Sequence, residues 1–428
     1  MKTKDFIGTA ALAALTTAAG FAIATPASAD VTTRWNGATE TREEDRRFHV
    51  SGRFMYDVAY TDADCANAGC TGANEAGIRS YARRAFIGVD GRLTEHWRYN
   101  AKFDFGFGSA GSIKADDFYL EYAGDAGSLF FGNGNWVSPM EDRDSSLNIP
   151  FNERSFLITA LGFGKKPGVG YLTNGGNWSA GVAVQSPDGL DTGDTASNGS
   201  EPFFVIGRGT WAPIYQQTPE GTMFLHLGLD LRYRNNGNGS GNALNGTFSY
   251  SPGALSNKSS NNAGVGAAAG DTYYGAEFAF QWNSLGFDGE YGKAQTRDYV
   301  GNATQLGDAD LTGWYVDVFW SPTGESRRYN AADGSFGGVS PARTLGSDGG
   351  IGHIMLSGRI EELDLSDANF GANANESKAW TVGATWVPIS HVKFQLNYSQ
   401  TDVDYTVNNA AHVDNTIDAV TLRTQFDW

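Results

Sequence analysis

The chain of 428 residues lacks any apolar run that could form a membrane-spanning helix once its first 29 residues are set aside. Such a helix needs about 20 consecutive apolar residues. In lipid, only helices and closed barrels satisfy every backbone hydrogen bond. If the chain enters a membrane, it must therefore do so as a β-barrel. Only 12 prolines but 56 glycines are present, a balance that suits twisted strands and tight turns.

Positive charge is also scarce, with 31 Lys and Arg against 48 Asp and Glu and a formal net charge of −17. Nucleic-acid binding needs clustered basic residues to neutralise phosphates, so this balance excludes nucleic acid as a partner. It leaves open which ions a channel would pass, because ion selectivity depends on local rings of charge and not on the total.

The first residues read as an export signal. Residues 1–29 combine a basic start at Lys2 and Lys4, an apolar core and a small-residue cleavage site, Ala27-Ser28-Ala29, which is typical of a cleaved signal peptide. Residues 30–47 read as a polar periplasmic arm, either a solvated linker or a subunit contact. Residues 48–428 are predicted to form a single barrel domain.

Cysteine is nearly absent, since only Cys65 and Cys70 occur. In an exported protein, two cysteines so close in sequence are predicted to form a disulfide within a loop. A metal site would need more ligands nearby than this stretch offers, and no cofactor or metal is predicted. The six histidines are scattered and accompany no catalytic motif of the Gly-x-Ser-x-Gly or His-Glu-x-x-His type.

From residue 48 onward, apolar and polar residues alternate in segments of about ten, the length that a tilted strand needs to cross a bilayer. One segment, 96–107, has aromatic residues on one face and charged residues on the other, and the chain ends in the same way at Trp428. The pattern predicts an all-β, antiparallel transmembrane barrel of about sixteen strands with both termini on the periplasmic side. The predicted strands lie near 48–60, 78–90, 96–107, 114–123, 127–133, 166–173, 177–185, 203–212, 222–234, 272–282, 285–294, 312–320, 351–361, 378–387, 391–401 and 418–428.

Connections between these strands alternate between short turns and long loops rich in Asn, Gly, Ser and Asp. The long loops are predicted at 61–77, 186–201, 235–271, 295–311 and 402–417. Two connections differ from this pattern. Residues 134–165 are unusually rich in charge and aromatic residues. Residues 321–350 form a long connection, although the strand order places them on the periplasmic side, where the connections are short turns. Both segments are predicted to fold into the lumen, where 134–165 would form the constriction.

An ordered set of motifs resembles the phosphate-selective porin O and P family. The matching segments are Tyr81–Leu93, Trp97-Arg98-Tyr99, Asp117–Tyr122, Pro139 to Arg154 with Ser145-Ser146, and Gly313–Tyr315 leading into Pro322–Tyr329. The resemblance implies a sixteen-stranded homotrimeric porin of the bacterial outer membrane. In such a porin the third outer loop, here within 134–165, narrows the lumen, and basic residues bind phosphate or polyphosphate. The chain departs from the family in that no lysine stands close before Ser145 and that 139–144 is net acidic.

Basic residues facing the lumen are the candidate solute-path residues, because the planar fork of Arg fits phosphate oxygens and Lys offers a point charge. The predicted path residues are Arg84, Arg98, Lys102, Arg232, Arg234 and Arg359 on the wall, with Arg143, Ser145, Ser146, Arg154, Lys165 and Lys166 in the third loop. Further inward cations are Arg53, Lys393 and Arg423, and Arg327 and Arg328 could reach the lumen from the turn end. About half of these arginines are expected to pair with inward acids, namely Asp57, Asp104, Asp117, Glu121, Asp230, Glu277, Asp288, Glu290 and Asp317.

The leading functional prediction is passive diffusion of small anions, phosphate or polyphosphate first, across the bacterial outer membrane. The first alternative is a weakly selective or cation-leaning diffusion porin, which inward acids near the constriction would favour. A barrel enzyme and a structural barrel without conductance are more distant alternatives. The expected partners are outer-membrane lipid, small anions and two further copies of the chain.

Overall fold

The computed structural model describes most of the predicted barrel. The described residues are 32–35, 39–65, 77–106, 113–186, 203–218, 221–235, 248–250, 261–262, 270–301, 304–346, 349–367, 375–407 and 411–428. The predicted signal peptide, 1–29, lies outside these residues. The predicted disulfide does too, because Cys70 and the side chain of Cys65 are not described.

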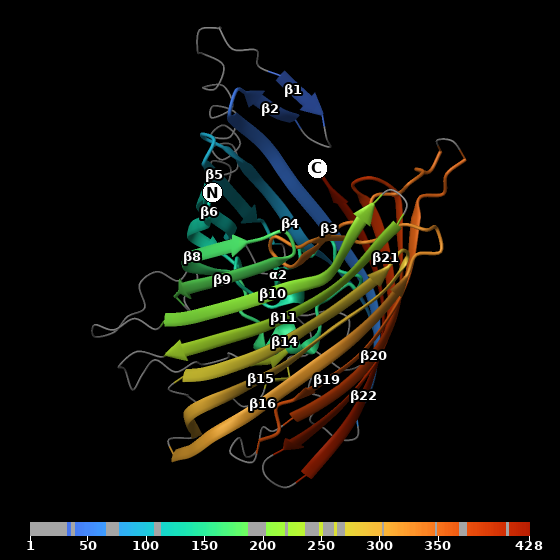
Figure 1. Ribbon diagram of the computed structural model, residues 1–428. Helices are drawn as coiled ribbons and strands as arrows, with labels where there is room; N and C mark the ends of the chain where they lie inside the picture. The colour runs from blue at the N-terminus through green and yellow to red at the C-terminus, as the bar shows by residue number, and fades with distance from the viewer. Residues whose placement is uncertain are drawn as a thin grey trace, which may run out of the picture.

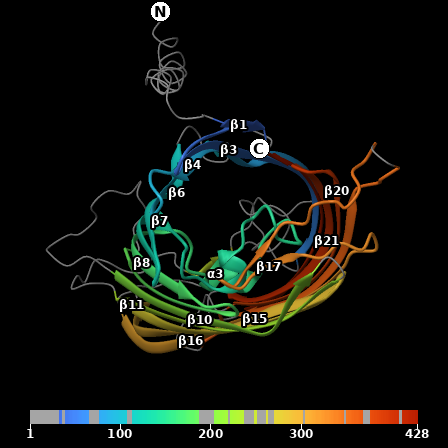
Figure 2. The same ribbon diagram turned by 45° about the horizontal axis from the view of Figure 1, so that its top comes forward.

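Sixteen antiparallel strands form a closed barrel (Figures 1 and 2). They are β3 (Arg46–Cys65), β4 (Gly77–Arg92), β5 (Trp97–Asp104), β6 (Lys114–Gly124), β7 (Gly127–Gly134), β8 (Lys166–Asn174), β9 (Trp178–Gln185), β10 (Phe203–Thr218), β11 (Gly221–Asn235), β14 (Gly270–Trp282), β15 (Leu285–Gly301), β16 (Thr304–Trp320), β19 (His353–Asp364), β20 (Asn375–Ile389), β21 (Val392–Val407) and β22 (Ala411–Asp427). The pairing of β22 with β3 closes the barrel. Beyond it, Trp428 and Gly52 exchange two backbone hydrogen bonds of 3.0 and 3.1 Å. The predicted barrel and its strand number are confirmed.

Two further strands extend the sheet at the turn end, which is the end of the barrel where short turns join the strands. β1 (Thr32–Trp35) and β2 (Thr39–Glu43) form a hairpin, and β2 pairs with the start of β3. This hairpin lies within the segment that the sequence assigns to a polar arm. The arm therefore contains ordered sheet next to the barrel instead of a linker alone.

At the opposite end, which we call the loop end, several strands run further than the sequence predicts. β15 and β16 leave only 302–303 between them, and β21 and β22 leave only 408–410. The predicted loops 295–311 and 402–417 are therefore largely strand. The alternation of apolar and polar residues stops where the lipid stops, whereas backbone pairing continues beyond it, so the alternation marks only the membrane-spanning part of each strand.

The two faces of the wall differ as lipid and lumen require. Large apolar side chains are exposed on the outer face, for example Leu229, Trp282 and Ile360. Their neighbours on the inner face are buried charged residues such as Arg232 and Arg359. In the described part of the chain, no helix is both long and apolar enough to cross a membrane.

Among the described residues, three segments of the chain reach into the lumen. The constriction loop, residues 135–165, carries α2 (Met140–Arg143) and α3 (Phe156–Leu161). The turn-end segment, residues 321–352, carries the hairpin of β17 (Arg328–Asn330) and β18 (Ser335–Gly337). Figure 2 shows α3 and β17 inside the ring of strands, as the sequence predicts for 134–165 and for part of 321–350. Leu345 of the second segment lies instead with outer-face residues such as Trp386 and Leu396. A third small hairpin, β12 (Ser249–Tyr250) with β13 (Asn261–Asn262), belongs to a predicted surface loop.

The apolar core of this protein sits inside the barrel, between α3 and the wall from β7 to β19. Leu157 and Leu161 of α3 pack with wall residues such as Tyr273, Tyr315 and Leu363. The β12 hairpin joins this core through Phe248 and Tyr250, which are almost fully buried. One side of the lumen is therefore filled, and two cavities lie along β19, β20, β21, β22 and β4.

Candidate functional site

Two arginines on the wall hold the constriction loop by the same arrangement. Arg423 of β22 binds Asp57 of β3 with two hydrogen bonds of 2.7 Å and reaches Glu153 of the loop at 3.0 Å. Arg359 of β19 binds Asp317 of β16 with two hydrogen bonds of 2.7 Å and Glu141 of the loop at 2.6 Å. Each arginine thus bridges a carboxylate of the wall and a carboxylate of the loop. We call these groups the Arg423 anchor and the Arg359 anchor.

The path of the loop is also held through its backbone carbonyl groups, which accept hydrogen bonds from side chains. Arg154, in the loop itself, donates to the carbonyls of Glu141 and Asp144 and so closes the loop on itself. Asn135 of the loop likewise donates to the carbonyl of Asp142. The wall supplies further donors: Arg232 to the carbonyls of Leu161 and Gly162, Lys393 to Leu147, Gln395 to Ile149 and Pro150, and Arg423 to Asn152. The loop has one well-defined shape because both ends and the middle are fixed.

Carboxylates of the wall accept the free N–H groups at the start of each short helix. Glu290 of β15 accepts from the N–H groups of Met140 and Glu141 at 3.1 and 2.7 Å. Glu361 of β19 accepts from the N–H of Phe156 at 2.6 Å, while Ser155 caps α3 by accepting from Ile158. The first N–H groups of a helix have no partner within it, and an acceptor there stabilises the helix start.

The turn-end segment meets the constriction loop through charged groups. Arg327 donates to Asp288 of β15 at 2.7 Å and lies 3.4 Å from Asp144 of the loop. Asp144 also accepts from the N–H of Phe336 at 2.7 Å. Burial raises the pKa of Asp144 to about 7, although the nearby Arg327 opposes this shift. Arg143 is paired with Asp333 at 2.9 Å, so the sequence candidates Arg143 and Arg327 both serve to join the two segments.

Three water-accessible cavities border the constriction loop among the described residues. One, of about 530 Å³, lies between Arg143, Ser145 and Asn148 of the loop and the β17–β18 hairpin. The loop-end cavity has a volume of about 350 Å³ and is bordered by β4, β19, β20, β21 and β22. The turn-end cavity, of about 400 Å³, is bordered by the ends of β19 to β22 and the turn-end segment. Loop residues 147–149 line the turn-end cavity and 151–154 line the loop-end cavity. This stretch of the loop therefore lies between the two cavities and forms the narrow part of the path.

Three wall cations on the open side are not engaged by carboxylates, and Arg154 of the loop, which also lines the loop-end cavity, bonds only backbone carbonyls among the described residues. Within the residues that the structure describes, Arg53, Arg84 and Lys393 form no ion pair. Arg53 donates to the Ser146 hydroxyl at 2.7 Å and covers the Phe86 ring. Arg84 has only a weak contact with a methionine sulfur at 3.7 Å. Arg84 lines the loop-end cavity and Lys393 the turn-end cavity, so each of these two cavities contains an uncompensated cation.

A bulge in β4 places a second arginine beside Arg84. The pairing between β3 and β4 shifts register between Met55 and Tyr56, so Arg83 and Arg84 both reach the lumen although they are adjacent in sequence. Arg83 binds Glu153 at 2.7 and 2.9 Å. Burial alone would raise the pKa of Glu153, but the charges of Arg83 and Arg423 hold it well below its usual range. Strict alternation puts Arg83 on the lipid side, which is why sequence reasoning missed it.

The other predicted path residues lie away from the open path or are paired. Arg232 and Arg234 are buried in the filled side beneath α3, close to Asp271. Arg98 lies at the turn-end rim with Glu121, its side chain 46% exposed. Lys102 and Lys165 bind Asp117, and Lys165 also binds Asp116. Ser145 forms a tight turn with Asn148 and lines the cavity at the β17–β18 hairpin, and Lys166 is the first residue of β8.

Charge is segregated across the lumen. The open side carries Arg53, Arg83, Arg84, Lys393 and Arg423, with Asp57 as the buried wall acid. The filled side carries Asp230, Asp271, Glu277, Asp288, Glu290 and Asp317, with Arg208, Arg232 and Arg234. Arg359 and Glu361 of β19 lie at its edge and also line the loop-end cavity. Arg208, which pairs with Glu277 at 2.7 Å, was not among the sequence candidates. Figure 2 shows the two sides facing each other, β3 and β4 opposite β15 and β16.

Comparison with known proteins finds a matching family, a relative similar in sequence and solved structures with the same fold. The family model named Phosphate-selective porin O and P matches residues 48–428. Porin O of Pseudomonas aeruginosa is 24% identical over 446 residues, and the alignment covers 94% of each chain. Two solved structures share the fold at low identity. The anion-selective porin from Comamonas acidovorans has a TM-score of 0.54 at 12% identity, covering 90% of this chain and 100% of that one. OmpT of Vibrio cholerae in its trimer form has a TM-score of 0.51 at 11% identity, with the same coverage.

The family match and the closed barrel indicate a channel of the bacterial outer membrane rather than an enzyme. The match spans the whole barrel, from the first residues of β3 to the C-terminus. It also agrees with the sequence motifs in the second to fourth strands and the constriction loop. The chain is an outer-membrane porin and belongs to the phosphate-selective porin O and P family.

Proposed function

We propose that this porin passes small anions by passive diffusion, with phosphate as the first candidate solute. The observation that carries the proposal is Arg84, a cation on the loop-end cavity that forms no ion pair among the described residues. Beside it, Arg83 shares its charge with a single carboxylate. An anion that leaves bulk water needs replacement hydrogen bonds, and a guanidinium fork matches the oxygens of phosphate.

The lining of the loop-end and turn-end cavities suggests the order of contacts along the path. Hydroxyl groups of Thr381, Ser399 and Thr401 line the loop-end cavity opposite Arg84, and a hydroxyl can donate to an oxyanion or accept from its protonated form. Past the loop stretch 147–152, Lys393 provides the next cation. Modest sites in series favour conduction, because each site must release the ion that it binds.

Relatives support the choice of anions without deciding the solute. The matching family is described as phosphate-selective, and the Comamonas porin of the same fold is described as anion-selective. In this chain the constriction loop has no lysine close before Ser145. The wall cations Arg84 and Lys393 are therefore the groups on which phosphate recognition would depend.

A weakly selective or cation-leaning pore is the second candidate, because Asp142, Glu153 and Glu361 also line the loop-end cavity. Their carboxylates are engaged, however. Asp142 accepts from the N–H groups of Phe163 and Gly164, Glu361 accepts from Phe156, and Glu153 pairs with two arginines. An engaged carboxylate attracts a passing cation less than a free one would, which favours the anion pore.

The test is the reversal potential of the purified porin in planar bilayers under a salt gradient, followed by titration of phosphate into chloride. Anion-selective current that low phosphate concentrations block supports a phosphate pathway. Anion-selective current without phosphate block keeps the anion pore but assigns it another solute. Cation-selective current contradicts the proposal and establishes the second candidate.

A homotrimer is the proposed assembly. OmpT of Vibrio cholerae has a trimer form, and in this chain the short strands β5, β7 and β9 have eight residues each. That wall carries exposed Trp97, Phe103 and Phe131, an apolar surface that a second copy could cover. Migration of the unheated protein as a trimer, and as a monomer after heating, would support this assembly, and a monomer in both states would contradict it.

A further inference from the structure

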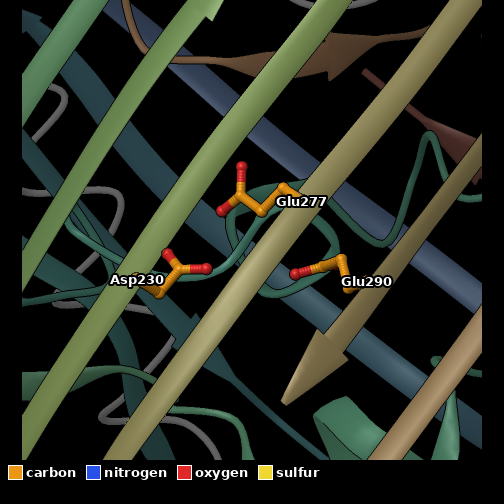
Figure 3. A group of neighbouring side chains, drawn as sticks. All are labelled: Asp230, Glu277 and Glu290. Carbon is orange, nitrogen blue, oxygen red and sulfur yellow. The ribbon is translucent and has the colours of Figure 1, made fainter.

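Three carboxylates converge on the filled side of the lumen, away from the open path. Asp230 of β11, Glu277 of β14 and Glu290 of β15 lie on neighbouring strands and point toward one another (Figure 3). An oxygen of each lies within 4.8 Å of an oxygen of each of the others, and all three residues are buried. Oxygens at such separations can bind the same ion, since calcium–oxygen distances are about 2.3–2.6 Å.

Asp230 is the member of this cluster whose oxygens accept no hydrogen bond, and its one ion pair within the described chain is the contact with Arg208. Its side chain is 1% exposed, and neither carboxylate oxygen accepts a hydrogen bond from any described residue. The nearest cation, Arg208, lies 3.7 Å from one oxygen but directs both of its hydrogen bonds on the cluster to Glu277. A buried carboxylate that accepts no hydrogen bond is costly, so Asp230 indicates a ligand that the described residues do not supply.

Two glycines make room for the cluster. Gly228 is paired with Glu277, and Gly275 is paired with Asp230. A Cβ atom at Gly228 would lie 2.3 Å from a carboxylate oxygen of Glu277, and one at Gly275 would lie 2.9 Å from a carboxylate oxygen of Asp230. Both distances are too short for any side chain to fit without moving a carboxylate. The glycines therefore allow the carboxylates to lie along the wall and face each other.

The charges at the cluster do not balance. The three carboxylates have one guanidinium beside them, that of Arg208. His226 and Glu277 share a hydrogen bond of 2.8 Å. Glu290 forms no ion pair within the described chain and accepts from Tyr315 and from the N–H groups of α2. With all three carboxylates ionised and the histidine neutral, two negative charges remain, which one divalent cation would compensate.

We propose that Asp230, Glu277 and Glu290 form a binding site for a hard divalent cation, of which calcium is the test ion. Oxygen-only ligands favour calcium or magnesium over transition metals. Because Glu290 also accepts the first N–H groups of α2, the ion would fix the start of the constriction loop to the wall. This site is independent of the solute and of the anion selectivity of the pore.

The experiment measures calcium bound to the full-length porin after chelator treatment, re-equilibration with micromolar calcium and removal of free ions. The wild-type chain is expected to hold about one more ion per chain than Asp230→Asn, which removes one carboxylate ligand. Asp117→Asn is the matched control, because it removes a lumen carboxylate of the same size near Lys102 and Lys165. It should keep the ion. Equal calcium in all three proteins would overturn the proposal.

Two further measurements keep the proposal testable if Asp230→Asn does not fold. Calcium should raise the midpoint of thermal unfolding of the wild-type porin, because a ligand that binds only the native state stabilises it, and Glu290→Gln should lose this shift. Crystals of the wild-type porin soaked in terbium, which occupies calcium sites, should show an anomalous peak between the three carboxylates. A map without that peak would reject the site without any variant.

Discussion

The open and filled sides of the lumen differ in what their charges do. On the filled side, the carboxylates of β11 to β19 hold the constriction loop, by accepting its N–H groups or by pairing with arginines. On the open side, cations outnumber acids, and Arg84 and Lys393 face the cavities. The formal charge of −17 therefore does not describe the path. Much of the buried acid supports the loop, and the linings of the loop-end and turn-end cavities carry more cations than acids.

The largest expected effect comes from breaking an anchor. Arg423→Met leaves Asp57 and Glu153 without their shared partner, and an unpaired buried charge costs about 3–5 kcal/mol. We expect the free energy of unfolding in detergent to fall by that amount, measured by urea titration. Arg359→Met should cost a similar amount, because the Arg359 anchor has the same arrangement.

The double variant Asp57→Leu with Arg423→Met is the control for this prediction. It removes the buried wall charge together with its partner and should recover part of the lost stability. If Arg423→Met unfolds at the same urea concentration as the wild-type protein, the anchor does not hold the loop.

Asp144, where the two lumen segments meet, should make stability depend on pH. Its pKa is raised from about 4 in the unfolded chain to about 7 in the native state, so the native state binds an extra proton between these values. The stabilising contribution is complete below pH 4, falls as the pH rises to 7, and is then constant. We expect a change of a few kcal/mol at most, seen as the difference between urea titrations of the wild-type protein and Asp144→Asn across this range. Parallel profiles for the two proteins would exclude Asp144 as the titrating group.

Charge reversal on the open side should change selectivity more than stability. Arg84→Glu replaces the unpaired cation of the loop-end cavity with an anion, and we expect the anion-to-cation permeability ratio to fall by roughly tenfold. Reversal potentials in planar bilayers measure the ratio, and the effect should weaken at high salt because mobile ions screen the charge. An unchanged ratio would show that solutes do not pass Arg84.

Arg98→Gln should have the smallest effect. Arg98 lies at the rim, is half exposed and is paired with Glu121, and such pairs contribute about 0–1 kcal/mol. We expect nearly unchanged stability by urea titration and an unchanged permeability ratio. If Arg98→Gln lowers the ratio as much as Arg84→Glu, the distinction between paired rim cations and unpaired cavity cations is wrong.

The fold could be read from the sequence because lipid imposes a simple rule on every strand. Residues such as Leu229 and Trp282 face lipid, alternate with buried polar residues, and mark sixteen membrane crossings. The strand ends at 301–304 and 407–411 could not be predicted, since no lipid contact distinguishes pairing beyond the membrane from loop. The β12 hairpin was missed as well, because Phe248 and Tyr250 are two aromatics in a long polar segment.

The site was less predictable, because alternation shows only that a residue faces inward. Arg84 and Arg232 look alike in sequence, yet one lines a cavity and the other is buried beneath α3. Which side of the lumen is filled depends on how 135–165 packs, and this packing is a tertiary property without a local signal. The bulge that brings Arg83 inward could not be predicted either. One extra residue in β4 does not visibly change the pattern of a strand that mixes apolar and polar residues.

The way in which the constriction loop is held separates its shape from its chemistry. Much of its path is fixed through carbonyl groups, which Arg154, Arg232, Lys393 and Gln395 bind, and a carbonyl is present whatever the residue type. Substitutions at positions such as Leu147 or Ile149 can therefore change what the pore admits while the loop keeps its course. With the backbone path fixed in this way, single substitutions can change the solute without a change in the course of the loop.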